Sequence, residues 1–188
     1  SNIAKYTDGR FFPKGLAQVA IPLTEEVSHS RLLPVSETRH DQAAHSLLVL
    51  HDEDSHLGPI TNDFKTTLGA VRISTGAHIS PFATSEKVVQ FVDDLMQEQD
   101  GRWSERLGSI KSVMTVDDIV KEALKLGVTQ IVSPYAAVGP AQAMLQNLQE
   151  AAASYDISIV RYLNAYDLMC WPHATHGFFR FKEHIPKF

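Results

Sequence analysis

The stretch from Thr129 to Arg161 limits the possible folds most, because it reads as strand, loop, helix and strand in direct succession. Its first segment, TQIVS, and its last, ISIVRY, are rich in β-branched residues, which favour strands. PAQAMLQNLQEAAASY, between them, consists mainly of Ala, Leu and Gln, which favour helices. Two strands joined by one helix form a βαβ unit with parallel strands. A ligand site is therefore expected in the loop SPYAAVGP, at the carboxyl end of the first strand.

A second pair of strand and loop lies upstream of this unit. Leu47 to Leu50 is a continuous apolar run, and the acidic segment HDEDSHLGP follows it. Such a run is typical of a central parallel strand covered by helices on both faces. GAVRIST is a further strand candidate, and TVDDIVKEALKLGV is the clearest helix, with Thr115 as N-cap and Gly127 at its end. We therefore predict an α/β fold, a three-layer Rossmann-like doubly wound sheet of about five mainly parallel strands.

The region between the second and third strand candidates is predicted to be helical. PITNDFKTTL suggests a short helix with Pro59 at its first position. After Thr84, apolar residues recur at spacings of three and four, which predicts a helix with one buried face. GRWSERLGSI is interpreted as a separate short helix. The residues expected on the buried face are Val88, Phe91, Val92, Leu95 and Met96.

The chain divides into a lead-in and a domain. Residues 1–44 contain scattered prolines and no sustained period, so we interpret them as an extended lead-in or linker, with a short strand candidate at Leu16 to Ile21. Residues 45–188 are expected to form the α/β domain with an irregular, aromatic C-terminal tail and a short helix near Asp167. Because this lead-in suggests that another part of the parent protein precedes the domain, we expect coding sequence upstream of Ile3.

Composition excludes several classes of protein. The chain is 44% hydrophobic and 21% charged, as in ordinary globular proteins. A net charge of −5 argues against non-specific nucleic-acid binding by the whole surface. Cys170 is the single cysteine, so no intrachain disulfide can form, and we expect a cytoplasmic location. No apolar run approaches the roughly 18 residues of a membrane helix, so we expect no membrane contact.

The most metal-like feature of the sequence is a cluster of acidic residues and histidines after the first strand candidate. Carboxylates and imidazoles close in sequence can hold a divalent ion. We favour a solvated polar loop, because consecutive side chains point in different directions and no second cluster would complete the site. The cluster consists of His51, Asp52, Glu53, Asp54 and His56.

Other familiar motifs are weak or missing. Cys170 with His173 or His176 lacks further zinc ligands and any feature that would activate the thiol, so we interpret it as a buried cysteine. The chain contains no GxGxxG, Walker or GxSxG motif. The helix that begins near Pro140 can accept an anion at its N-terminus, as all such helices can. Core or interface packing, rather than base stacking, is the interpretation for Trp103, Trp171, Phe178, Phe179 and Phe181.

The C-terminal third of the chain carries a family resemblance. The strand TQIVS leads to a loop with Tyr135 and Pro140, then to a helix, a strand, Asp167-Leu168, and a Gly-Phe-Phe-x-Phe motif at residues 177–181. This order resembles the end of the α/β domain of DNA photolyases and cryptochromes. The sequence departs from that family in four features. Its first clear strand starts near Ser46, the next loop is acidic instead of arginine-rich, Gln146 replaces an acidic residue, and FKEHIPKF replaces Phe-Thr-Pro-Phe.

The resemblance implies a diverged antenna-type domain, not catalytic by itself and separated from the helical FAD-binding domain of a photolyase-like parent. A parent with the two domains in reversed order is our hypothesis to explain the lead-in at residues 1–44. The implied parent is a light-dependent DNA-repair lyase or a photoreceptor. The implied partner is the FAD-binding domain, and DNA would be contacted only through the parent. Some members of the family carry a folate or deazaflavin antenna on this domain. The positions expected to bind such a chromophore are His51, Asp52, Ser55, Ser133 and Tyr135.

Two alternatives from other classes stay open. A stand-alone nucleotide-binding domain of the universal-stress-protein kind uses the same type of fold, although it needs a glycine-rich phosphate loop late in the chain, where only Gly139-Pro140 stands. A small metal-dependent hydrolase would instead use the acidic loop at residues 51–56.

Overall fold

The computed structural model describes residues 2–12, 41–54, 56–76 and 82–188. The chain forms two compact units, Ser1–Leu32 and Leu33–Phe188. The described part of the first unit contains one short helix, α1 (Asn2–Tyr6). This helix lies within the segment that the sequence analysis interprets as an extended lead-in or linker, and it was not expected there. The strand candidate at Leu16 to Ile21 lies outside the described residues.

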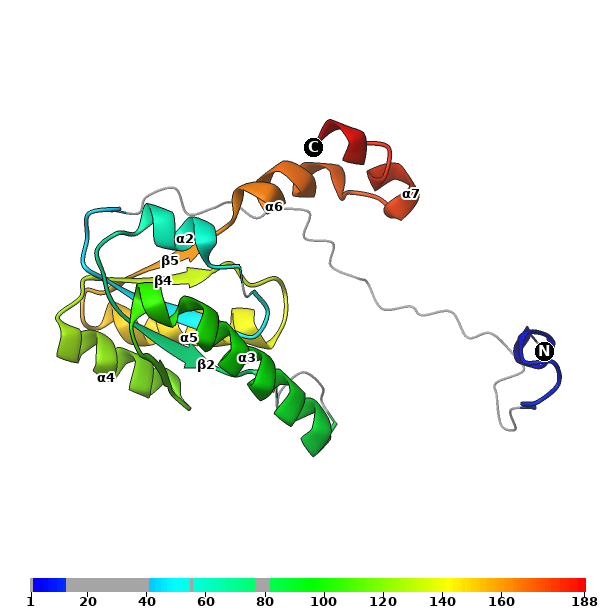
Figure 1. The fold of residues 1–188 in the computed structure, drawn as a ribbon, viewed down its shortest axis with the longest axis horizontal. Helices are drawn as coiled ribbons and strands as arrows, with labels where there is room; N and C mark the ends of the chain where they lie inside the picture. Colours follow the sequence, from blue (N-terminus) through cyan, green and yellow to red (C-terminus); the bar gives the residue numbers. More distant parts are fainter. Residues whose placement is uncertain (1, 13–40, 55, 77–81) are drawn as a thin grey trace. The chain divides into compact units, whose positions relative to one another are not determined.

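The second unit is built on a parallel sheet (Figure 1). The five strands have the order β3-β2-β1-β4-β5, and each neighbouring pair is parallel. Residues Leu47 to His51 pair with Gly69 to Ile73 on one side of β1, and Ser46 to Leu48 pair with Gln130 to Val132 on the other. The predicted fold class is thereby confirmed. The strands are β1 (Ser46–His51), β2 (Thr67–Ile73), β3 (Ile110–Ser112), β4 (Gln130–Pro134) and β5 (Ser158–Tyr162).

Helices cover both faces of this sheet (Figure 1). The short helix expected near Asp167 is confirmed as α6, and 3-10 turns follow it at Trp171–His173 and Ile185–Lys187. None of the helices that the structure describes is long and apolar enough to cross a membrane. The helices of this unit are α2 (Gly58–Asp63), α3 (Glu86–Leu107), α4 (Val116–Leu126), α5 (Pro140–Ala153), α6 (Ala165–Cys170) and α7 (Phe178–Phe181).

The apolar side chains of β1 belong to two separate hydrophobic cores, because successive side chains of a strand point to opposite faces of the sheet. Leu47 and Val49 belong to the core beneath α4 and α5, together with fully buried Leu148. Leu48 and Leu50 belong to the core beneath α2, against which Trp103 of α3 packs. All six β1 residues are buried, as expected for a strand covered on both faces.

Helix α3 corrects two expectations. It continues through Gly101 to Leu107, where two separate helices had been predicted. Gly108 follows as the C-cap, and its φ of 73° suits glycine. The segment after it forms β3, an edge strand that the sequence did not reveal because only Ile110 among its three residues is apolar. Tertiary pairing with β2, from Ala70 to Arg72, overrides the weak local signal.

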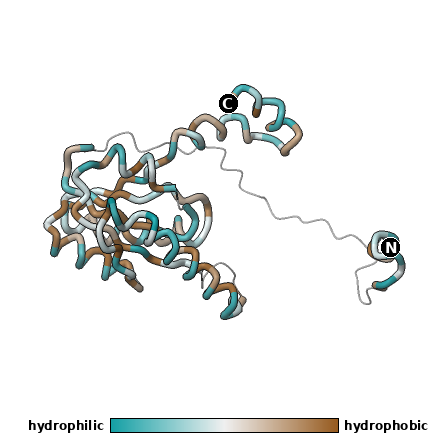
Figure 2. The backbone as a smooth tube through the Cα atoms, viewed as in Figure 1, coloured by the Kyte–Doolittle hydropathy of each residue, from teal (hydrophilic) through white to brown (hydrophobic). Residues whose placement is uncertain are grey.

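The apolar face predicted for α3 is only partly buried. Met96 is 2% exposed, whereas Val88, Phe91 and Leu95 are 44%, 63% and 52% exposed. The N-terminal turns of the helix extend beyond the sheet in Figure 1, so their apolar side chains find no strands beneath them. Figure 2 shows brown, hydrophobic segments in this helix as well as in the sheet. The periodicity predicted the helix correctly and its burial wrongly.

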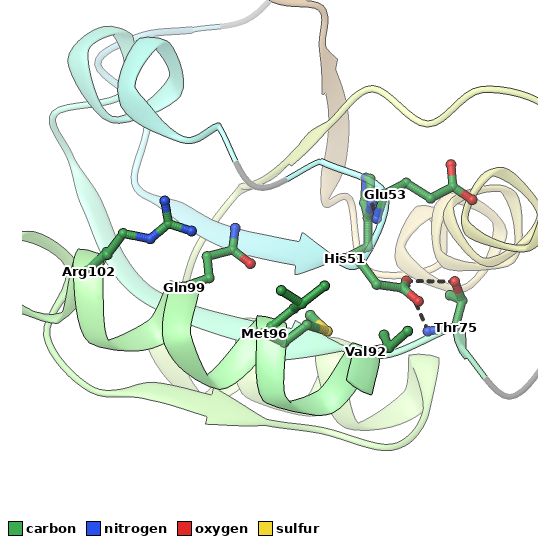
Figure 3. Close-up of a pocket in the computed structure, with 9 residues that line it drawn as sticks. His51, Glu53, Thr75, Val92, Met96, Gln99 and Arg102 are labelled. Carbon is green, nitrogen blue, oxygen red and sulfur yellow. Dashed lines mark hydrogen bonds between the residues drawn. The ribbon is translucent and has the colours of Figure 1, made fainter. Parts of the chain in front are cut away.

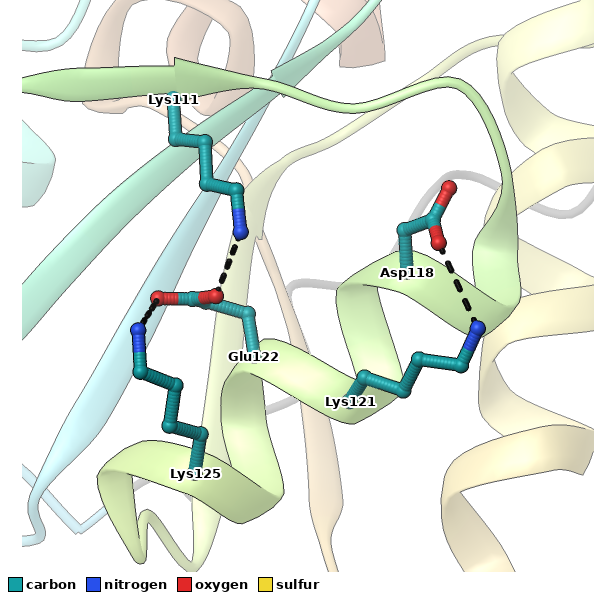
Figure 4. Close-up of polar contacts among 5 residues, drawn as sticks. All are labelled: Lys111, Asp118, Lys121, Glu122 and Lys125. Atoms are coloured by element: carbon teal, nitrogen blue, oxygen red, sulfur yellow. Dashed lines mark hydrogen bonds and ion pairs between the residues drawn. The ribbon is translucent and has the colours of Figure 1, made fainter.

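Helix α4 forms as the sequence predicted. The Thr115 hydroxyl accepts a hydrogen bond from the Asp118 amide at 3.2 Å, and Gly127 closes the helix in the left-handed conformation. On its outer face, Glu122 binds Lys111 of β3 at 2.8 Å and Lys125 at 3.4 Å (Figure 4). The hydrogen bond from Lys111 is the main cause that lowers the pKa of Glu122. These contacts hold α4 against the edge strand.

Candidate functional site

The order of the strands defines a topological switch point. The chain passes from β1 to β2 and β3 on one side of the sheet and then continues with β4 and β5 on the other side. The loops after β1 and β4 therefore leave the carboxyl edge in opposite directions, and ligands of open α/β sheets bind in the crevice between such loops. The two loops that sequence reasoning selected are the two that flank this switch point.

His51, at the end of β1, links the two loops and is fully buried. Its Nε2 donates a hydrogen bond to the Pro134 carbonyl oxygen at 3.0 Å, and its Nδ1 accepts one from the Glu53 amide at 3.2 Å. Both ring nitrogens are thereby occupied in one neutral tautomer. The structure gives His51 a structural role at the switch point and leaves it no free nitrogen for a ligand.

The carboxylates after His51 accept hydrogen bonds from different parts of the chain. Asp52 Oδ1 accepts hydrogen bonds from the Thr75 hydroxyl at 2.7 Å and the Thr75 amide at 3.1 Å, at the end of β2. Glu53 Oε1 accepts a long hydrogen bond from the Ala141 amide in the first turn of α5, at 3.4 Å. Asp54 accepts from the backbone of the following turn. Within the described residues, no group of three His, Cys, Asp or Glu side chains could hold a metal ion.

The loop after β4 places its two candidate residues in different surroundings. Ser133 is fully buried, and its hydroxyl has no hydrogen-bond partner among the described residues. The Tyr135 ring packs edge-on against Trp171, with ring centroids 5.4 Å apart and an interplanar angle of 81°. The Tyr135 amide donates to the carbonyl oxygen of Tyr162 at 2.8 Å, which joins the ends of β4 and β5.

Two cavities flank the loop at residues 51–54. We call the first the inner cavity; it has a volume of about 210 Å³ and lies between the end of β1 and α3 (Figure 3). We call the second the outer crevice; its volume is about 370 Å³ and it lies between the ends of β1, β4 and β5. The outer crevice is lined by Glu53, Asp54, Tyr135, Ala137, Asn164, Asp167 and Trp171.

The structure gathers the predicted binding residues at one edge of the sheet but not in one cavity. His51 and Asp52 line the inner cavity, and Tyr135 lines the outer crevice. Ser133 lines neither of them. Ser55 lies outside the described residues. The described members of this set thus lie at the same edge of the sheet but in different surroundings, because the loops after β1 and β4 leave that edge in opposite directions.

Several residues of these cavities were missed by sequence reasoning. Asn164 lies at the end of β5 and caps α6, with its Oδ1 accepting from the Asp167 amide at 2.9 Å. A polar residue after a predicted strand was a signal that could have placed it at the carboxyl edge. Gln99 continues the apolar stripe of α3 three residues after Met96, and a lone polar residue in such a stripe was the available signal. Trp171 could not be placed without the tertiary fold.

The aromatic tail was expected to pack in the core or in an interface, and two of its rings are not part of the core. Trp171 is half-buried and Cys170 is buried, but Phe178 and Phe179 are 66% and 75% exposed. Their short helix, α7, lies beyond the sheet, so no strand covers these rings. Histidines of the tail contact one another instead, with the rings of His173 and His184 stacked at 4.3 Å.

Tyr162, at the end of β5, yields a testable titration. Its hydroxyl donates to the Asp63 carboxylate at 2.7 Å, and burial together with that bond raises the pKa of Tyr162 to about 12. The folded state thus keeps the phenol protonated above the unfolded pKa of 10, and the stability from this bond is present below pH 10 and lost as the pH rises to about 12. Alkaline titration of tyrosinate absorbance should show a step near pH 12 that Tyr162→Phe removes; an unchanged titration curve would contradict this assignment.

Comparisons with known proteins leave the family of this chain open. No protein-family model matches the chain, and a search of curated proteins finds no significant match.

Proposed function

We propose that the α/β unit is a diverged antenna-type domain of a photolyase-related flavoprotein and has no catalytic activity by itself. The observation that carries this proposal is the outer crevice. It lies at the switch point and combines the edge-on pair of Tyr135 and Trp171 with three carboxylates, those of Glu53, Asp54 and Asp167. Aromatic walls with a few polar groups are typical of sites for planar cofactors. The resemblance at residues 129–181 supports the same class.

The chemistry of the crevice favours one kind of chromophore. Ionised carboxylates only accept hydrogen bonds, so the ligand must supply donors. The pterin ring of a folate carries an amino group and ring N–H groups, whereas a deazaflavin ring offers fewer donors. The aromatic pair would contact either ring system. We therefore propose a folate as the antenna and keep a deazaflavin as the second choice within this function.

The crevice fits a nucleotide less well, which weighs against a stand-alone nucleotide-binding domain. The N-terminus of α5 is the natural place for a phosphate in such a fold, yet the Ala141 amide there already donates to Glu53. The crevice is lined by carboxylates, which repel phosphate groups. A phosphate would have to displace Glu53 and then remain close to Asp54 and Asp167.

The parent protein completes the proposal. FAD would bind in a helical domain supplied by the parent, and this domain would be the direct partner of the α/β unit. DNA would be contacted only through the parent, and the location would be cytoplasmic. The gene that encodes this chain tests the kinship: an adjoining helical segment with flavin-binding motifs is expected, and an adjoining region of another kind would contradict it.

Chromophore binding tests the site itself. Purified protein mixed with methenyltetrahydrofolate should retain the chromophore absorbance through gel filtration. Trp171→Leu should weaken this binding about tenfold, since stacking on an aromatic ring contributes about 1–3 kcal/mol. Phe179→Leu is the matched control, because Phe179 is exposed and lies outside the crevice lining. Retention of folate by Trp171→Leu with unchanged affinity would place the chromophore elsewhere, and no retention of folate or a deazaflavin by the original protein would refute the site.

A further inference from the structure

The inner cavity is a separate space with its own lining. Its apolar side comes from α3 through Val92, Leu95 and Met96. The ends of β1 and β2 supply polar groups, including Asp52 and Thr75. The outer crevice shares only Glu53 with it. A mostly apolar wall with a few polar groups at defined positions is the usual character of a small-molecule site.

Gln99 is the observation that points to a ligand. Gln99 is 2% exposed and lines the inner cavity. Its Nε2 is buried without a hydrogen-bond partner among the described residues. Figure 3 shows the Gln99 side chain rising from α3 toward β1, beside Arg102. A buried donor without a partner destabilises a protein by about 1–3 kcal/mol, and native structures retain few of them. An acceptor atom placed in the cavity would satisfy this amide.

The surrounding charges indicate that this acceptor is neutral. Arg102 lines the same end of the cavity in Figure 3, but its guanidinium already pairs with Glu98 at 2.7 Å. Asp52 and Glu53 add negative charge to the lining, which would repel a carboxylate or a phosphate. A carbonyl oxygen accepts from Gln99 without this repulsion. Amide N–H groups on the same molecule would find acceptors in the two carboxylates.

The volume limits the size of the ligand. An apolar cavity of about 150 Å³ is enough to bind benzene. At about 210 Å³, the inner cavity has room for one ring with a small substituent. A two-ring or three-ring chromophore of the kind proposed for the outer crevice exceeds that space.

We propose that the inner cavity binds a small, neutral, single-ring amide or lactam. Its carbonyl oxygen accepts a hydrogen bond from Gln99 Nε2, and its ring lies on Val92, Leu95 and Met96. Its N–H groups face the carboxylates at the end of β1. This site is distinct from the outer crevice and does not depend on the photolyase kinship.

Benzamide is a suitable probe, because it joins one ring to one neutral amide. Its affinity for the complete chain can be measured by saturation-transfer difference NMR, with the Gln99 side-chain amide followed in ¹H–¹⁵N spectra. Benzamide should bind and shift those two amide resonances. Gln99→Met removes the donor and keeps an unbranched side chain, so it should weaken binding about tenfold, the effect of one lost hydrogen bond.

Two controls separate the hydrogen bond from general packing. Gln97→Met makes the same change at an exposed position of α3 outside the cavity and should leave the affinity for benzamide unchanged. Toluene has a ring but no carbonyl, so Gln99→Met should not weaken its binding. Replacing Gln99 by Met should leave the fold intact, because it substitutes an apolar group for an amide whose buried Nε2 has no partner among the described residues.

If benzamide does not bind the original protein, or if Gln99→Met binds it with unchanged affinity, the site is refuted. Should Gln99→Met not fold, Leu95→Trp provides the second variant: Leu95 is half exposed at the cavity, and a larger ring there should abolish binding. Full binding by a folded Leu95→Trp protein would also overturn the proposal.

Discussion

Replacing His51 by leucine is expected to lower the free energy of unfolding by about 2–4 kcal/mol, although leucine is apolar and the site is buried. Leucine can neither donate to the Pro134 carbonyl oxygen nor accept from the Glu53 amide, which His51 contacts at 3.0 Å and 3.2 Å. Each polar group left unpaired in the interior costs about 1–3 kcal/mol. Urea unfolding followed by circular dichroism measures the loss.

His56→Leu is the matched control for this substitution. His56 lies in the same loop, but its side chain is exposed, so the change should alter the free energy of unfolding by no more than about 0.5 kcal/mol. Equal stability losses in both variants would show that the loop tolerates no leucine, and a neutral His51→Leu would remove the structural role assigned to the imidazole. Because His51 joins the ends of β1 and β4, its loss should also weaken folate binding in the outer crevice.

Leu148→Ala is expected to be the most destabilising single truncation, at about 2–5 kcal/mol. Leu148 belongs to α5, is fully buried and lies in the core between the sheet and the two helices α4 and α5. Removing its methyl groups leaves a cavity that close-packed neighbours fill only in part. The same urea titration detects the effect as a lower midpoint with an unchanged slope.

Leu124→Ala provides the comparison for this core position. Leu124 is also a helical leucine, but it is 45% exposed on α4, so its truncation should cost less than about 1 kcal/mol. The difference between the two variants reports burial alone, since helix propensity changes equally in both. If the two truncations were equally mild, α5 would not be packed on the sheet as the structure shows.

Sequence patterns predicted most of this architecture, and the physical reason is local. The four strands that were identified carry continuous apolar or β-branched runs, and α4 carries both an N-cap and a closing glycine. Such signals depend on neighbours within a few residues, so they can be read without the fold. Strand β3 had no such signal, because its three residues are held by pairing with β2.

The site was predictable only as a region. Loops after β1 and β4 were selected correctly, since parallel strands bring their carboxyl ends to one edge. Which side chain faces which cavity depends on contacts between residues far apart in the chain. The His51 side chain forms a hydrogen bond with Pro134, and the Asp52 side chain forms one with Thr75. Two of the predicted binding residues therefore have a structural role in the fold. Gln99 and Trp171 line the cavities, and they belong to helices whose position relative to the sheet no local sequence pattern specifies.

The order of apolar and polar residues along the chain is sufficient to specify a layered α/β unit, because side-chain periodicity dictates what each segment can bury. The order of the strands, the exposure of the apolar face of α3 and the division of the carboxyl edge into two cavities arise only when the segments pack. These three features depend on contacts between segments that are remote in sequence. The free energy of such contacts cannot be read from any one segment alone, so only the packed structure determines them.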